Sequence, residues 1–225
     1  MIPPETIKNA RKDVLGPGSE DNFVLFWINR NAKRKRPSDL LLSWKLFLDK
    51  LSDKEKKKVN LILHTDPFDQ EGPNLVAAAN MLGVTDTIHF STDRIDFDKI
   101  NVLHNISDVC INMSFAEGFG LSTLESMQCG NPIIALKTGG QTRQVVDHRD
   151  GSENGVALPV EFQTLVGSQS VPYIYEDYVS QNTVADAIYK LYSMPIDERK
   201  KLGKKAKDYV ASEFAYQTTV DLWHD

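Results

Sequence analysis

The sequence of 225 residues predicts an α/β fold: a Rossmann-like parallel sheet flanked by helices on both faces. Short apolar runs alternate with segments whose apolar residues recur at helical spacing, which is typical of repeated βαβ units. Polar or glycine residues follow directly where several apolar runs end. Because parallel strands end along one edge of the sheet, these residues are expected to meet there and bind a ligand.

Five apolar runs bounded by turn residues predict the strands, at 23–28, 59–64, 87–90, 109–113 and 132–136. Segments of helical periodicity lie between or after them, at 37–51, 74–82, 97–105, 121–128, 183–192 and 196–214. Pro37 suits the first turn of its helix, and Gly83 and Gly130 are typical of residues that end one.

Three segments depart from this alternation. Residues 1–21 are rich in proline, glycine and charge, so we expect a linker or arm before a domain that spans 22–214. The aromatic insertion 171–175 is expected to pack on the sheet edge, which we favour over a role in acceptor binding. Residues 215–225 predict a final helix whose Trp223 needs an apolar partner.

Composition excludes several classes of protein. A formal net charge of -5 argues against a general nucleic-acid binder. No apolar run approaches the ~20 residues of a membrane-spanning helix, and residues 1–4 begin no signal peptide. Cys110 and Cys129 stand in apolar contexts, so we interpret them as reduced thiols and expect a cytoplasmic protein.

The most informative segment is the turn of residues 117–125, which follows the fourth predicted strand. Its glycines, Gly118 and Gly120, allow backbone N–H groups to approach a phosphate at the start of a helix. Glu117 and Glu125 can accept hydrogen bonds from sugar or ribose hydroxyls. Ser122 and Glu125 also fit a capping box, so for Glu125 a structural role and a ligand role remain equally open.

Basic residues follow the first strand. Arg30 stands at the strand end and is the best candidate to stabilise the charge on a diphosphate leaving group. Lys35 is the next, with Arg36 as its possible substitute, while Lys33 and Arg34 are interpreted as solvated.

No metal site or cofactor is expected. Asp96 and Asp98 form a D-x-D pair that could hold a divalent cation, but they precede a helix, where capping and dipole interactions explain them better. The five histidines lack zinc spacing. The sequence contains no nucleophile elbow, Walker loop or strand-linked G-x-G-x-x-G, so hydrolase, kinase and dehydrogenase functions lack support.

Residues 109–140 resemble the retaining glycosyltransferases of family four, which have the GT-B fold. The resemblance rests on Glu117 and Glu125, which match the two glutamates of that family, on the intervening glycine turn, and on the segment 129–132. Residues 29–31 and 34–36 resemble the family's phosphate-binding arginine and lysine. The likeness extends over about 23–214.

The resemblance implies a role for each candidate residue. Arg30 and Lys35 would hold the donor diphosphate, with the choice between Lys35 and Arg36 open. Glu117 would bind the transferred sugar and Glu125 the ribose. The phosphates would meet the backbone of Gly118, Phe119, Gly120 and Leu121, and the base would lie near Ser91 and Thr92.

The resemblance covers only the C-terminal, donor-binding half of the GT-B fold, so we expect the N-terminal acceptor-binding half to be absent. The predicted function is to bind a nucleotide-sugar donor in a retaining, metal-independent glycosyltransferase, whose other partner is a sugar or glycan acceptor. Segment 215–225 resembles the helix that crosses back to the other half, which implies that Trp223 is exposed or contacts another chain. Two alternatives remain: a non-catalytic subunit that needs a separate acceptor-binding chain, and a metal-dependent transferase that uses Asp96 and Asp98.

Overall fold

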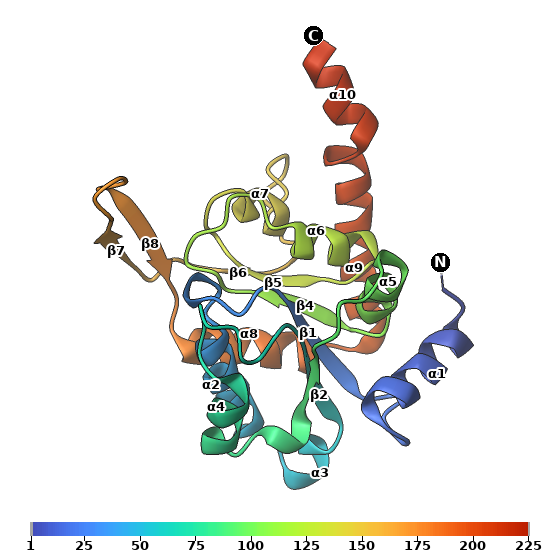
Figure 1. Ribbon diagram of the computed structural model, residues 1–225. Helices are drawn as coiled ribbons and strands as arrows, with labels where there is room; N and C mark the ends of the chain where they lie inside the picture. The colour runs from blue at the N-terminus through green and yellow to red at the C-terminus, as the bar shows by residue number, and fades with distance from the viewer. Residues whose placement is uncertain (1, 225) are drawn as a thin grey trace.

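The computed structural model describes residues 2–224, and a six-stranded parallel sheet forms its centre (Figure 1). The strand order is β3-β2-β1-β4-β5-β6. The strands are β1 Phe23–Ile28, β2 Val59–His64, β3 Ile88–Ser91, β4 Val109–Asn112, β5 Ile133–Leu136 and β6 Gly155–Leu158. The predicted Rossmann-like α/β fold is therefore confirmed.

Helices cover both faces of the sheet (Figure 1). One face packs against α2 (Pro37–Leu48), α4 (Leu75–Leu82) and α8 (Gln181–Ser193), which share the largest hydrophobic cluster with the strands. The other face packs against α1 (Pro4–Leu15), α5 (Phe97–Asn105), α6 (Leu121–Gln128), α7 (Gln141–Val145) and α9 (Ile196–Glu213). Side chains of β1, β2 and β4 are buried on both faces, as expected for a parallel sheet covered on both sides.

The order of the strands fixes the position of the site. From β1 the chain adds β2 and β3 on one side, and from β4 it adds β5 and β6 on the other, so β1 and β4 are neighbours at a topological switch point. Loops that leave the carboxyl ends of these two strands diverge and leave a crevice between them. The loop after β1 contains the short helix η1 (Lys33–Lys35), and the loop after β4 leads into α6.

The predicted arm at 1–21 is wrong in its local structure, because Pro4–Leu15 forms α1. Arg11 anchors this helix: its Nε donates to the carbonyl of Ile106 (2.9 Å), and an Nη pairs with Asp108 (2.9 Å). Apolar side chains of α1 pack on the cluster around Val24 and Phe26. The sequence pattern missed the helix because these contacts are distant in sequence.

The region after β5 is more regular than its sequence pattern indicates. It contains α7, β6 and a separate two-stranded sheet of β7 (Phe162–Val166) and β8 (Ile174–Tyr178). Aromatic residues of the insertion 171–175 lie in this projecting hairpin and are exposed, so the expected packing on the sheet edge is wrong. Short elements α3 (Asp53–Lys56) and η2 (Thr85–Thr87) complete the connections.

The chain ends in α10 (Tyr216–His224), which extends away from the sheet (Figure 1). The side chain of Trp223 is exposed, so within the described residues it lacks the apolar cover that the sequence predicts. No helix between residues 2 and 224 combines the length and the apolar character needed to cross a bilayer.

Candidate functional site

A cavity of about 400 Å³ lies between the β1 and β4 loops and the start of α6. It contains most of the predicted site residues. It is lined by Lys35, Glu117, Phe119, Gly120, Leu121 and Glu125, together with Asn29 and Ser122. Asn29 and Ser122 were not assigned to the site from sequence, although both are neighbours of residues that were.

Lys35 and Glu117 form an ion pair in this cavity. The ammonium group of Lys35 donates to the Glu117 carboxylate, and Arg34 lies 3.6 Å from the same oxygen. Both partners are largely buried, with side chains 9% and 10% exposed. Burial opposes ionisation of Glu117, but the nearby Lys35 and Arg34 outweigh it, so the pKa of Glu117 lies below its ordinary value.

Burial has the opposite consequence for the lysine. Loss of hydration lowers the pKa of Lys35, and the pairing with Glu117 offsets this effect only in part. A buried ammonium group of this kind is poorly hydrated, so it gains more from a charged ligand than an exposed lysine does. The pair thus presents one cation and one carboxylate to a ligand that enters the cavity.

Arg36 points away from this cavity. Its backbone is left-handed (φ 55°), which turns the chain between η1 and α2. The guanidinium group pairs with Asp39 (2.8 Å), donates to the carbonyl of Val179 (3.1 Å) and lies over the ring of Tyr178. Of the two candidates left open by the sequence, Lys35 is the one that lines the cavity.

Arg30 lies outside the residues that line the cavity, with a side chain 60% exposed. Its guanidinium group pairs with Asp69 (2.7 Å) and with Glu71 (3.0 Å), both in the loop after β2. Hydrogen bonding to Asp69 is the largest cause that raises the pKa of Arg30 above its ordinary value. Arg30 is thus occupied by two carboxylates, which a phosphate would have to displace.

The glycine turn leads directly into α6. Gly120 is the N-cap residue in the left-handed conformation (φ 89°), and no side chain caps the first turn. The predicted capping box of Ser122 and Glu125 is therefore not formed, because the helix begins at Leu121 rather than after Ser122. Glu125 instead lines the cavity, 3.5 Å from the ring of buried His104. The N–H groups of the first turn of α6 remain available to an anion.

The loop after β5 packs against the back of this turn. The N–H of Gly140 donates to the carbonyl of Glu117 (3.2 Å). A Cβ at Gly139 would lie 2.1 Å from the carbonyl oxygen of Glu117, and one at Gly140 would lie 2.4 Å from that of Gly118. The two glycines are therefore required for the close backbone contact that holds the turn.

Gln144 was missed by the sequence analysis. Its side chain is fully buried on α7, where Nε2 donates to the carbonyl of Phe119 (2.7 Å) and Oε1 accepts from the hydroxyl of Thr123 (2.5 Å). It thus connects the glycine turn with the first turn of α6. Its position four residues after Gly140 was the only available signal, because the contacts themselves depend on tertiary structure.

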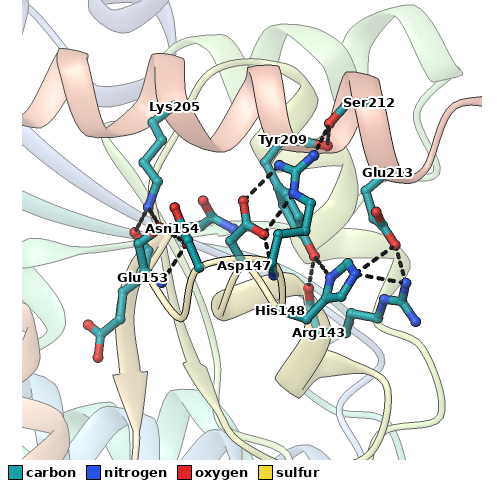
Figure 2. Close-up of polar contacts among 12 residues, drawn as sticks. Arg143, Asp147, His148, Glu153, Asn154, Lys205, Tyr209, Ser212 and Glu213 are labelled. Carbon is teal, nitrogen blue, oxygen red and sulfur yellow. Dashed lines mark hydrogen bonds and ion pairs between the residues drawn. The ribbon is translucent and has the colours of Figure 1, made fainter.

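Polar contacts tie α7 and the loop that follows it to α9 (Figure 2). Asp147 pairs with Arg149 (2.7 Å), and Arg149 also donates to the hydroxyl of Ser212 (3.0 Å). The Tyr209 hydroxyl donates to the carbonyl of Arg143 (2.7 Å). Hydrogen bonding to Arg149 is the main reason that the pKa of Asp147 falls to about 2. None of these residues lines the cavity, but the network fixes the helix that carries Gln144.

The remaining residues singled out from the sequence lie outside the cavity. Ser91 ends the edge strand β3 and its hydroxyl bonds the ring of His64 (2.9 Å), while Thr92 is exposed. Neither lines the cavity. Asp96 is the N-cap residue of α5, in the predicted position, but its side chain makes no capping hydrogen bond. Within residues 2–224, no three histidine, cysteine, aspartate or glutamate side chains are grouped as a metal site would require.

Several solved structures have the same fold. Anabaena HepE in complex with UDP-glucose superposes with a TM-score of 0.71 at 18% identity, over 96% of this chain and 50% of HepE. The C-terminal domain of the glycosyl transferase group 1 family protein LpcC of Francisella tularensis gives 0.69 at 20% identity, over 96% of this chain and all of that domain. These likenesses show that the chain has the fold of a GT-B C-terminal domain.

Sequence relatives are named as glycosyltransferases. D-inositol 3-phosphate glycosyltransferase 2 of Catenulispora acidiphila is 26% identical over 183 residues, and D-inositol 3-phosphate glycosyltransferase of Corynebacterium jeikeium is 25% identical over 201 residues. The matches cover 80% and 89% of this chain. They cover 42% of each relative, so the chain spans less than half of their length. The family model of the glycosyl transferases group 1 matches residues 8–209, and the chain therefore belongs to this family.

Proposed function

We propose that this chain is the donor-binding domain of a retaining glycosyltransferase, and that its cavity binds a nucleoside diphosphate sugar. The observation that carries the proposal is the meeting of Lys35, Glu117 and the uncapped start of α6 around one cavity. A diphosphate needs positive charge and N–H donors, and a sugar needs hydrogen-bond acceptors. The UDP-glucose complex of the HepE structure supports this class of ligand.

In the proposed reaction, the bond between the anomeric carbon and the diphosphate oxygen breaks and the electron pair leaves with the diphosphate. An acceptor hydroxyl oxygen forms the new bond to that carbon on the same face, and its proton leaves with the diphosphate. Lys35 and the N–H groups of 118–121 stabilise the growing negative charge. Stabilisation of this kind is usually the largest single contribution to the rate of an enzyme-catalysed reaction. Arg34 lies at the same carboxylate as Lys35 and adds to the positive potential. This concentration of charge supports metal-independent transfer, with no cofactor.

Glu117 has a second task in this scheme. When a phosphate takes Lys35 as its partner, the carboxylate of Glu117 is released to accept sugar hydroxyls and to face the positive charge at the anomeric carbon. In the free cavity its pKa lies below the ordinary value because of Lys35 and Arg34, so the carboxylate is ionised when the ligand arrives. Glu125 is proposed to bind the ribose, and Ser91 and Thr92 the base. Arg30 is proposed to reach the diphosphate only after leaving Asp69.

The acceptor is proposed to be a sugar or glycan, bound with the help of a further domain or chain. The cytoplasm is the proposed compartment, supported by the two free cysteines. Calorimetric titration with UDP, GDP and ADP, each with and without a chelator, tests the proposal. Binding of one nucleotide that is unchanged by the chelator supports it, and silence from all three contradicts it. Turnover, by this chain, of a sugar donor that carries the nucleotide found to bind would then exclude the non-catalytic alternative.

A further inference from the structure

The hairpin of β7 and β8 projects from the body of the domain (Figure 1). Its base is attached to both loops that form the candidate site. The N–H of Asp177 in β8 donates to the carbonyl of Phe115 (2.8 Å), and the N–H of Phe115 donates to the carbonyl of Arg34 (3.1 Å). Phe115 is two residues from Glu117, so the hairpin is hydrogen-bonded to the loop that holds the proposed catalytic carboxylate.

The hairpin has two distinct faces, because successive side chains of a strand alternate. On one face Phe162 stacks on Tyr178 (centroids 4.9 Å apart), and Tyr178 contacts Phe115 and Arg36 of the domain. The register pairs Leu165 with Tyr175 on the other face. We call this second face the outer face; its residues are Gln163, Leu165, Tyr173, Tyr175 and Asp177.

Apolar side chains are exposed on both faces of the hairpin, Phe162 and Ile174 among them on the first face, and those of the outer face lie next to one another. The side chains of Leu165, Tyr173 and Tyr175 are 54%, 66% and 50% exposed. The rings of the two tyrosines meet edge to face with centroids 5.5 Å apart, and their hydroxyls are 3.1 Å apart. A two-stranded hairpin is only marginally stable by itself. Exposed aromatic side chains that pack into no core add little to its stability, and a group of them is typical of a binding surface.

We infer that the outer face binds the sugar rings of a glycan acceptor, an inference that rests on the proposed function. A tyrosine has an apolar ring face and a polar tip, and a pyranose ring likewise has C–H faces and a rim of hydroxyls. At the base of the outer face, the Gln163 amide donates to the Asp177 carboxylate (2.5 Å). These two groups offer the further donors and acceptors that sugar hydroxyls require.

The location favours a glycan over a polypeptide as the occupant. The acceptor of a glycosyltransferase must approach the carbon that faces Glu117, and a chain of several sugars extends beyond that point. The hairpin is hydrogen-bonded to the Glu117 loop through Phe115, so sugars further along the acceptor can reach its outer face. Among the possible occupants, the acceptor is the one that must itself reach the carbon facing Glu117.

The test uses the whole chain on an array of immobilised oligosaccharides, with UDP present. We expect the wild-type chain to bind a defined group of glycans. The affinity of the Tyr173→Ala/Tyr175→Ala double variant for these glycans should be lower by a factor of about ten or more. Tyr189→Ala removes a similarly exposed tyrosine from α8 and is the matched control, for which binding should not change.

Parallel titration with UDP separates the possible failures. Equal UDP affinity of all three proteins, with weaker glycan binding by the double variant alone, supports the inference. If the wild-type chain binds UDP but no glycan, or if the double variant binds glycans normally, the inference fails while the donor site stands. If the wild-type chain binds none of UDP, GDP and ADP, the proposed function itself fails. Dimerisation that the double variant abolishes, measured by sedimentation, would assign the face to a second copy and overturn the inference.

Discussion

The ammonium group of Lys35 pairs with the carboxylate of Glu117, although 82 positions separate them in the sequence. Adjacent strands β1 and β4 bring them together, since each residue lies in the loop that leaves the carboxyl end of one strand. The pair holds a cation and an anion in the free cavity. The diphosphate of a nucleotide sugar can compete with Glu117 for Lys35, and the sugar hydroxyls can donate hydrogen bonds to the carboxylate that is then released.

Lys35→Ala should weaken UDP binding by about 1–3 kcal/mol, because it removes a charge-assisted contact to phosphate and leaves Glu117 facing the ligand. Arg30→Ala should have a smaller effect, because Asp69 and Glu71 already occupy its guanidinium group. Lys204→Ala on the exposed face of α9 is the control and should have none. Calorimetry on the three variants checks the order, and an equal loss in all three would contradict the site.

Two glycine substitutions distinguish contact with phosphate from support of the turn. A Cβ at Gly118 meets no atom within 4 Å, so Gly118→Ala should fold normally and weaken UDP binding through contact with the ligand. Gly140→Ala would force a Cβ against the carbonyl of Gly118 and should lower both the melting temperature and UDP affinity. Thermal unfolding and UDP titration of both variants are the measurements. Unchanged affinity in Gly118→Ala would mean that phosphate does not approach this backbone.

Much of the fold could be predicted from sequence because hydrophobic periodicity and turn residues act locally. The segments 23–28, 59–64 and 97–105 have the predicted type and bounds. Helix α1 and the β7–β8 hairpin were missed because long-range contacts of Arg11 and Phe115 stabilise them. In the site, the meeting of Lys35 and Glu117 follows from strand order. The occupied state of Arg30 and the orientation of Arg36 depend on tertiary contacts that no local pattern encodes.

Gln144→Glu should make UDP affinity depend on pH. When protonated, the new side chain keeps a donor for the carbonyl of Phe119, but when ionised it presents a carboxylate to that carbonyl. Burial raises the pKa of such a group, so the protonated form should gain population as the pH falls from about 8 to about 5. The affinity of the variant relative to the wild type should therefore rise on acidification.

Gln144→Leu, which has no donor at any pH, is the matched comparison and should show a constant deficit over that range. Titration with UDP at several pH values on the folded variants measures both responses. A flat ratio for Gln144→Glu would show that the hydrogen bond to Phe119 does not govern the shape of the turn.

Asp147 should contribute to stability in a defined pH window. Its pKa in the folded protein is about 2, against an ordinary value of 3.8, because Arg149 and the backbone stabilise the charged form. A carboxylate whose pKa is lowered by folding stabilises the fold in full when the pH is above its pKa in the unfolded state. This contribution is lost as the pH falls from 3.8 through about 2. Urea unfolding should show a smaller acid loss for Asp147→Asn than for the wild type. Parallel pH profiles for the two proteins would contradict this assignment.

A crystal structure of the chain with UDP-glucose tests the central claim most directly. We predict that the diphosphate lies against the backbone of 118–121 and within hydrogen-bond distance of Lys35 Nζ, while the Glu117 carboxylate accepts from glucose hydroxyls. UDP-glucose bound elsewhere, for example beside the lysines of α9, with the Lys35–Glu117 pair unchanged, would contradict the account.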